Sequence, residues 1–263
     1  MSDRTERTGE TPLYSRVSSI DEGRIQLRGH DLVSEVMGRL SFTEAIHLVI
    51  LGTLPTPPSS RVLDAVLTAL IDHGVTSSTL AARMTYGAAP EAFQGAVAAG
   101  VLNSGGRVLG SMEGCGRLLS EWSDEAQGRG ADAAAASLVA AERAAGRRLP
   151  GMGHALHEDG DLRATRLFEV AADEGHAGVH IQLLRAVETE VERASGRRLP
   201  INVTGAVAAV LLDLGFRWQI LRGFGILSRI PGLIAHLDEE METSRVGHLV
   251  RHLQGGGTWS ELG

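Results

Sequence analysis

Helical periodicity runs through almost the whole of this 263-residue chain, and no convincing set of alternating strands interrupts it. Ser41 and Glu44 have the spacing of a capping box ahead of AIHLVILG, and the Pro-rich stretch TLPTPPSS separates this helix from the next. Further helical segments are expected at 60–72, from Pro90 onward, and at 131–145, 162–174, 177–195, 205–214 and 217–252, the last interrupted at Pro231. The sequence therefore predicts an all-α fold of about ten or more helices.

Composition supports a helical domain with polar ends. Aromatic residues make up only 4% of the chain, while apolar residues make up 43%, so the core must be built mainly from aliphatic side chains. Residues 1–12 are polar, and residues 254–263 run QGGGTWSELG. We expect one helical domain over 13–253, with a polar N-terminal tail at 1–12 and a flexible C-terminal tail at 254–263.

Charge and cysteine content exclude several classes of function. The formal net charge of −7 argues against a general attraction to nucleic acid or anionic lipid. The single cysteine, Cys115, excludes an internal disulfide framework, fits a reducing compartment and is expected to be buried. No apolar run approaches the roughly 18 residues of a membrane span, and the N-terminal residues are too polar for a secretory signal. We expect a soluble cytoplasmic protein with no nucleic-acid or membrane partner.

One sequence pattern occurs twice. ERAAGRRLP at 142–150 is repeated as ERASGRRLP at 192–200, and both copies are typical of a helix end that is capped by glycine and left through Leu-Pro. Different segments come after the two copies, GMGHALHEDGDLR after the first and INVTGAV after the second. Chemistry is therefore expected in these two exit loops.

Taken together and in order, these segments resemble the citrate synthase superfamily, and in particular its short citryl-CoA lyase-like members. The resemblance covers roughly residues 24–245 and is carried by five segments: RGHDLVSEVMGRLSFTEAIHLVILGTLPTP, DHGVTSSTLAAR, GMGHALHEDGDLR, LPINVTG and ILSRIPGLIAHLDEE. It implies an all-α fold with a large and a small helical subdomain, and a homodimer. The implied chemistry makes or breaks a carbon–carbon bond beside a CoA thioester. The implied ligands are coenzyme A, as acyl-CoA substrate or product, and a small oxo- or hydroxy-acid, with no metal.

This chemistry explains which residue types the resemblance selects. Cleavage removes a proton from a β-hydroxyl group and releases an enolate, so it needs a base near the hydroxyl, and carboxylates need arginine partners. His154 matches the loop histidine that acts as acid/base in the family. Imidazole suits this role because its ordinary pKa lies near neutrality. Arg163, nine residues later, matches a carboxylate-binding arginine. The alternative for Arg163 is an exposed arginine at a helix start.

Further residues match the binding of substrate and CoA. His73 matches the histidine that binds the oxo-acid, with a histidine stabilised by a helix C-terminus as the alternative. Arg229 matches a late substrate arginine, with a surface ion pair as the alternative. Gly151, Met152 and Gly153 lie on the loop whose main chain holds the adenine of CoA in relatives, although glycines are also ordinary turn residues.

The chain departs from the family pattern at several positions. Thr204 stands where the family has its acid/base aspartate, and a threonine hydroxyl is far too weak an acid to replace a carboxylate at the α-carbon. Leu109 or Gly110 takes the place of a histidine that polarises the thioester. Glu158 and METSRVG remove positive charge near the expected acid site. These departures indicate changed chemistry and argue against ordinary citrate as the substrate. A less charged acyl-CoA ligand fits better.

Three hypotheses stay open. The first is an enzyme with altered cleavage, condensation or thioester hydrolysis, in which His154 is the acid/base, Thr204 holds a water, and Asp161, Glu113 or Glu158 supplies the missing carboxylate. The second is a degenerate homologue that binds acyl-CoA or a partner subunit without turnover. The third is a purely structural helical domain.

The other histidines show no metal-ligating constellation. His248 and His252 lie one helical turn apart, but no third ligand is placed with them.

Overall fold

The computed structural model describes residues 15–21, 23–106, 109–153 and 160–255. The chain divides into two compact units, residues 1–60 and 61–263, and each is described by itself. The predicted tail at 1–12 and nearly all of the predicted tail at 254–263 lie outside the described residues. The proposed division into a large and a small helical subdomain stays a prediction.

The first unit contains a small sheet that the sequence analysis missed. Three antiparallel strands in the order β1-β2-β3 are followed by a π-helical turn and one helix: β1 Ser18–Asp21, β2 Arg24–Leu27, β3 His30–Asp31, η1 Leu32–Val36 and α1 Phe42–Leu51. These strands have at most four residues, which is too short for a clear alternating pattern.

The start of α1 is as predicted. The Glu44 N–H donates to the Ser41 hydroxyl at 3.2 Å, and the Ser41 N–H donates to the Glu44 carboxylate at 2.7 Å. At the other end of the helix, the Arg28 guanidinium donates to the Val49 carbonyl at 2.9 Å and to the Ile50 carbonyl at 3.2 Å. The Arg28 side chain therefore satisfies carbonyls that the last turn of a helix leaves unpaired.

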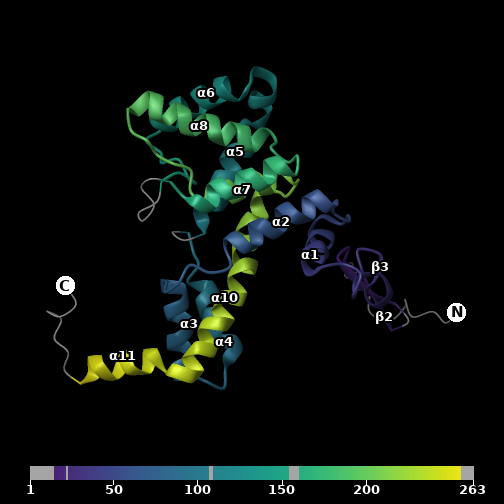
Figure 1. Cartoon of the computed structure of the whole chain (residues 1–263), viewed down its shortest axis with the longest axis vertical. Coiled ribbons are helices and arrows are strands. Elements are labelled where there is room, and N and C mark those ends of the chain that lie inside the picture. The colour runs from purple at the N-terminus through teal and green to yellow at the C-terminus, as the bar shows by residue number, and fades with distance from the viewer. Residues whose placement is uncertain (1–14, 22, 107–108, 154–159, 256–263) are drawn as a thin grey trace, which may run out of the picture. The chain divides into compact units, whose positions relative to one another are not determined.

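The second unit is helical throughout its described part (Figure 1), which confirms the all-α fold class. Its elements are α2 Pro57–Ala69, which begins just before the unit boundary, α3 Ser77–Ala88, α4 Phe93–Leu102, α5 Gly110–Arg129, α6 Ala131–Ala144, α7 Leu162–Asp173, α8 Val179–Ser195, α9 Val203–Asp213, η2 Trp218–Ile220, α10 Leu221–Thr243 and α11 Arg245–Gln254.

Helix α9 forms the centre of one group of helices. Its sequence VTGAVAAVLLD is small and apolar on all sides, and nearly all of its residues are buried. It contacts α5, α7 and α8, while α6 contacts α5 and α8. A second set of contacts joins α10 to α3 and α4, and α10 also contacts α5. The first residues of α7 and α9 belong to the two exit loops where chemistry was expected, so the packing of these two helices fixes the ends of those loops.

Two proline predictions were wrong. Pro231 lies inside the continuous helix α10 rather than at a break. An interior proline removes one backbone hydrogen bond, but the packing of α10 against α3, α4 and α5 holds the helix together. Pro90 is not a first helical residue, because α4 begins only at Phe93.

The segment Trp218–Thr243 also differs from expectation. Its length of 26 residues and mean hydropathy of 1.2 meet the length and composition expected of a membrane span, although the sequence analysis found no such segment. In this structure the segment packs within the second unit, and 44% of its most apolar window is buried.

Candidate active site

The two loops that come after the repeated pattern are joined by their backbones. The Asn202 N–H donates to the Gly151 carbonyl at 3.0 Å, and the Gly153 N–H donates to the Pro200 carbonyl at 2.7 Å. These bonds form an antiparallel bridge centred on Met152, whose own N–H and carbonyl therefore point away from the opposite loop. In the residues that the structure describes, the two exit loops where chemistry was expected therefore lie side by side.

Asn202 and Thr204 share one hydrogen-bond network at the start of α9. The Asn202 carbonyl oxygen accepts from the Gly205 N–H at 3.1 Å and from the Thr204 hydroxyl at 2.6 Å, while its amide nitrogen donates to the Gly153 carbonyl at 2.8 Å. The Ser111 hydroxyl lies 2.8 Å from the Thr204 hydroxyl. Because the Thr204 proton is given to Asn202, Ser111 is the donor in this pair. Thr204 therefore lies in an ordered pair of hydroxyls at the place where relatives are expected to carry a carboxylate.

Asp161 braces the starts of two helices. Its buried carboxylate accepts from the Arg163 guanidinium at 3.0 and 2.9 Å, from the Arg163 N–H at 3.1 Å and from the Val203 N–H at 3.0 Å. Burial raises the pKa of Asp161, but the hydrogen bonds from Arg163 and Val203 outweigh it and hold the pKa below its ordinary value. A carboxylate engaged in this way is a poor proton acceptor.

A cavity of about 660 Å³ lies beside these loops. Its walls bring together most of the residues predicted for the site: His73, Arg163, Arg229, Thr204 and the loop Gly151–Gly153, together with Ser111, Arg148 and Asn202. Among the described residues that line the cavity none is acidic, whereas three arginines are present. The described wall is therefore suited to an anionic ligand.

Arg229 is the most buried of these arginines, with 8% of its surface exposed. Burial lowers the pKa of Arg229, the neighbouring charge of Arg163 lowers it further, and Asp72 opposes both effects. The nitrogen Nη1 of Arg229 is buried and has no hydrogen-bond partner, and the Asp72 carboxylate lies 3.8 Å from it. A buried guanidinium N–H without a hydrogen bond is costly, and an anionic ligand in the cavity that Arg229 lines would offset the cost of its buried charge.

Comparison with known proteins identifies the family. The pattern of the citrate synthase C-terminal domain matches residues 55–252. The chain belongs to the citrate synthase family.

Several members of this family and of its fold are similar to the chain. The structure of citryl-CoA lyase from Hydrogenobacter thermophilus is 33% identical, with a TM-score of 0.82 and coverage of 88% of both chains. ATP citrate lyase from Methanothrix soehngenii, solved with citrate and coenzyme A, shares the fold, with a TM-score of 0.74, 20% identity, and coverage of 91% of this chain and 40% of that one.

Among curated sequences, citrate synthase 2 of Bacillus subtilis (strain 168) is 24% identical over 196 residues, or 74% of this chain. The chain spans about half the length of that relative, 51%.

Within this family fold, several predicted residues lie outside the cavity or outside the described part of the chain. His154 and Glu158 fall within 154–159, outside the described residues. Of the carboxylates considered as replacements, Asp161 is engaged by Arg163 and Val203, and Glu113 pairs with Arg222 at 2.7 Å. Neither Asp161 nor Glu113 lines the cavity.

Sequence reasoning missed Ser111 and Asn202. The signal for Asn202 was present, since asparagine directly before an apolar helix is a typical N-cap, and its side chain accepts from the third N–H after it. Ser111 left no such signal, because its contact with Thr204 spans 93 residues.

Cys115, His180 and Asp213 are titratable residues that do not line the cavity. Cys115 is buried as predicted, and burial raises the pKa of its thiol to about 12, which makes it unreactive. The His180 ring bonds the Asp213 carboxylate at 2.8 Å and so helps to join α8 to α9. No cluster of three or more His, Cys, Asp or Glu side chains suited to a metal ion occurs among the residues with described positions.

Proposed function

We propose that this chain makes or breaks a carbon–carbon bond next to a CoA thioester carbonyl, using a small oxo- or hydroxy-acid, with chemistry altered by Thr204. The observation that carries the proposal is the cavity, which is lined by Arg163, Arg229 and His73 together with the loop Gly151–Gly153. Two guanidinium groups and an imidazole suit the carboxylates of an acid, and the main-chain N–H and carbonyl of Met152 are not used by the bridge and so remain able to bind a ligand. Family membership and the similarity to citryl-CoA lyase support the same reaction class.

The proposed cleavage starts at a β-hydroxyl group. His154 takes the hydroxyl proton, the oxo-acid leaves, and the electron pair of the broken bond stays on the α-carbon of the CoA thioester as an enolate. That carbon must then gain a proton. A water held by the hydroxyls of Thr204 and Ser111 is the proposed donor, because no carboxylic acid stands among the described residues of the cavity wall, and the hydroxide left behind takes back the proton from the His154 imidazolium.

The experiment uses Thr204→Asp, with Thr204→Asn as the matched uncharged control. Oxo-acid release from citryl-CoA is followed with a coupled dehydrogenase, and free thiol release from a panel of acyl-CoAs reports condensation or hydrolysis. Thr204→Asp is expected to raise cleavage at least about tenfold, since a carboxyl group at this position can give the α-carbon its proton, whereas the amide of Thr204→Asn cannot. His154→Ala should abolish any wild-type turnover.

A second candidate function is binding of acyl-CoA without turnover. The hydrogen bonds at the site favour this candidate, because the Thr204 hydroxyl already donates to Asn202 and the Asp161 carboxylate already accepts from Arg163. A rise in melting temperature with CoA, without product from the wild type or from Thr204→Asp, would replace the enzyme proposal with this one. No rise and no product would contradict both.

A homodimer is also proposed, on the resemblance alone. Light scattering should report a particle of twice the 27.8 kDa chain at micromolar concentration, and a particle of single-chain mass would contradict it.

A further inference from the structure

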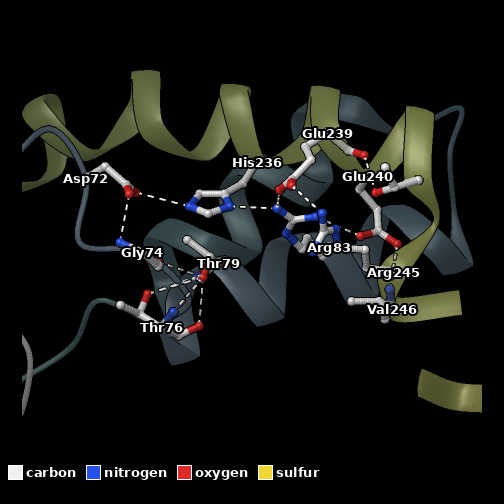
Figure 2. Close-up of polar contacts among 11 residues, drawn as sticks. Asp72, Gly74, Thr76, Thr79, Arg83, His236, Glu239, Glu240, Arg245 and Val246 are labelled. Carbon is white, nitrogen blue, oxygen red and sulfur yellow. Dashed lines mark hydrogen bonds and ion pairs between the residues drawn. The ribbon is translucent and has the colours of Figure 1, made fainter. Parts of the chain in front are cut away.

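A line of polar contacts leads from Asp72 along α10 to the start of α11 (Figure 2), and the next residue after Asp72, His73, lines the cavity. The Asp72 carboxylate, which lies next to His73 in the chain, is 3.2 Å from His236 Nε2. The other ring nitrogen of His236, Nδ1, lies 2.7 Å from the Arg83 guanidinium. These three side chains come from the loop before α3, from α10 and from α3, so the line joins separate elements of the second unit.

The neighbours of His236 fix which nitrogen carries its proton. A guanidinium can only donate, so Nδ1 of His236 accepts from Arg83. The proton of the neutral ring therefore sits on Nε2 and is donated to Asp72. His236 is 14% exposed, and this bond holds the Asp72 carboxylate on the α10 side of its loop.

Arg83 is held firmly at the other end of the line. Its buried guanidinium donates to Glu240 at 2.9 Å and is paired with Glu239. The same Glu240 carboxylate accepts from the Val246 N–H at 2.8 Å, in the first turn of α11, and Glu239 pairs with Arg245 at 3.2 Å. With both carboxylates on Arg83, the donor that faces His236 cannot easily turn away.

The Asp72 carboxylate lies close to the Gly74 N–H, to His236 and to Arg229. One oxygen accepts from the Gly74 N–H at 2.7 Å, which closes the turn that carries His73. The other oxygen accepts from His236 at 3.2 Å and lies 3.8 Å from Nη1 of Arg229, too far for a hydrogen bond. The Gly232 position allows this closeness, since a Cβ there would meet the Asp72 oxygen at 3.0 Å and the Ile71 carbonyl at 2.5 Å.

We propose that His236 is a positioning residue that keeps the Asp72 carboxylate from hydrogen-bonding to Nη1 of Arg229, so that the Arg229 guanidinium, which lines the cavity, is left for the carboxylate of the acid ligand. The inference rests on the proposed function for the identity of that ligand. Without the Nε2 donor, Asp72 moves about 1 Å to hydrogen-bond distance from Arg229 and competes with the ligand.

Two substitutions of His236 separate its two contacts. In His236→Gln the terminal amide reaches the position of Nε2 and can still donate to Asp72, whereas in His236→Asn the shorter side chain reaches Arg83 but not Asp72. His236→Asn should weaken citrate binding, measured by calorimetry, about tenfold, and His236→Gln should stay within about threefold of the wild type. The exposed His252→Asn on α11 is the control for histidine replacement as such.

A double variant distinguishes competition from general damage. Asp72→Asn combined with His236→Asn removes the competing charge but keeps an acceptor for the Gly74 N–H, so citrate affinity should return to the wild-type value or exceed it. The affinity for CoA should stay unchanged in all variants. A merely structural role of His236 would give a double variant weaker than either single one.

The outcomes separate this inference from the proposed function. Citrate affinities in the expected order, with no turnover of any acyl-CoA, would uphold the inference and contradict the enzyme. Turnover with equal citrate affinity in His236→Asn and His236→Gln, or a double variant that is not rescued, would overturn the inference alone. Failure of the wild type to bind citrate would also overturn it.

Discussion

Helices α6 and α8 end in the same sequence, Glu-Arg-Ala-x-Gly-Arg-Arg-Leu-Pro, but their last carbonyls are satisfied differently. At the end of α6 the Gly146 N–H donates to the Arg143 carbonyl and the Arg147 N–H donates to the Glu142 carbonyl, both at 3.0 Å. These are the paired bonds of a Schellman motif, with glycine in the left-handed conformation at φ 64°. The Arg147 side chain also pairs with Glu142 at 2.6 Å.

The end of α8 has the simpler cap. Its glycine, Gly196, has φ 65° and donates to the Glu192 carbonyl at 2.8 Å. The one residue that differs within the pattern explains the change, because Ser195 replaces Ala145 and its hydroxyl accepts from the Arg197 N–H at 3.2 Å. The N–H that closes the second bond in α6 is thus taken by a side chain in α8. A single hydroxyl changes the hydrogen bonds of the cap, whereas the left-handed glycine is the same in both.

The two copies differ more in the residues that come after each Leu-Pro than in their caps. After α6 come two glycines with positive φ, and after α8 comes the cap Asn202. The two ends are also tied directly, since the Arg143 guanidinium donates to the Ala194 carbonyl at 2.8 Å. The repeated pattern therefore sets out two similar exits, and the different residues beyond them build the cavity wall.

The largest effect is expected where the two exits touch. Gly151 has φ 82°, and a Cβ there would lie 2.8 Å from both the Cys115 sulfur and the Gly205 Cα. Gly151→Ala should reduce the free energy of unfolding by about 4 kcal/mol, from left-handed strain and from overpacking against backbone. Denaturant unfolding measures this, and a loss as small as that of an alanine at an open glycine would contradict the close contact.

Asp161→Asn tests the bond between the two helices that begin after these exits. The carboxylate joins Arg163 of α7 to Val203 of α9, so the substitution should cost about 2 kcal/mol at pH 7. Because the folded pKa of Asp161 lies below its ordinary value of 3.8, this contribution is present above pH 3.8 and is lost as the pH falls through the folded pKa.

Urea unfolding of Asp161→Asn and wild type, from pH 7 to pH 3, gives this pH dependence. The difference should shrink on acidification, and the exposed Asp173→Asn at the end of α7 should show no comparable difference at either pH. A difference that grows as the pH falls would mean that the carboxyl is destabilising when charged.

These local features were largely predictable, whereas the long-range contacts were not. Capping residues, helix segments and the two exit loops depend on neighbouring residues, so Ser41, Gly146 and Gly196 were readable from the sequence. Pro231 was misread because tertiary packing outweighs its local preference to end a helix. The contact of Asp72 with His236 spans 164 residues and depends on how α10 crosses the loop before α3, which no local pattern encodes.

The candidate site was predictable only through resemblance. The segments that carry His73, Arg163, Arg229 and Thr204 are each short, and their order along the chain made them recognisable. The pairing of Thr204 with Ser111 could not be predicted, since a hydroxyl accepts many partners and its choice is made by packing of α5 against α9.

A smaller effect is expected at the two capping glycines. Gly146 and Gly196 share nearly the same positive φ, and a Cβ would meet nothing within 4 Å at either position. Alanine at each should therefore cost about 1 kcal/mol, from backbone strain alone. Equal losses in denaturant unfolding would show that the two caps are energetically alike, and a markedly larger loss at one would show that its cap depends on more than the left-handed glycine.

The smallest effect is expected from Ser195→Ala, which makes the second copy identical to the first. Removing the hydroxyl frees the Arg197 N–H, which can then donate to the Glu192 carbonyl as Arg147 does to Glu142. Because one hydrogen bond replaces another, the free energy of unfolding should change by less than about 0.5 kcal/mol. Amide hydrogen exchange at Arg197 should remain protected in the variant, and Ala145→Ser is the reciprocal control at α6. Loss of protection at Arg197 without gain of the new bond would show that residues beyond the repeated pattern, and not Ser195, decide how the helix closes.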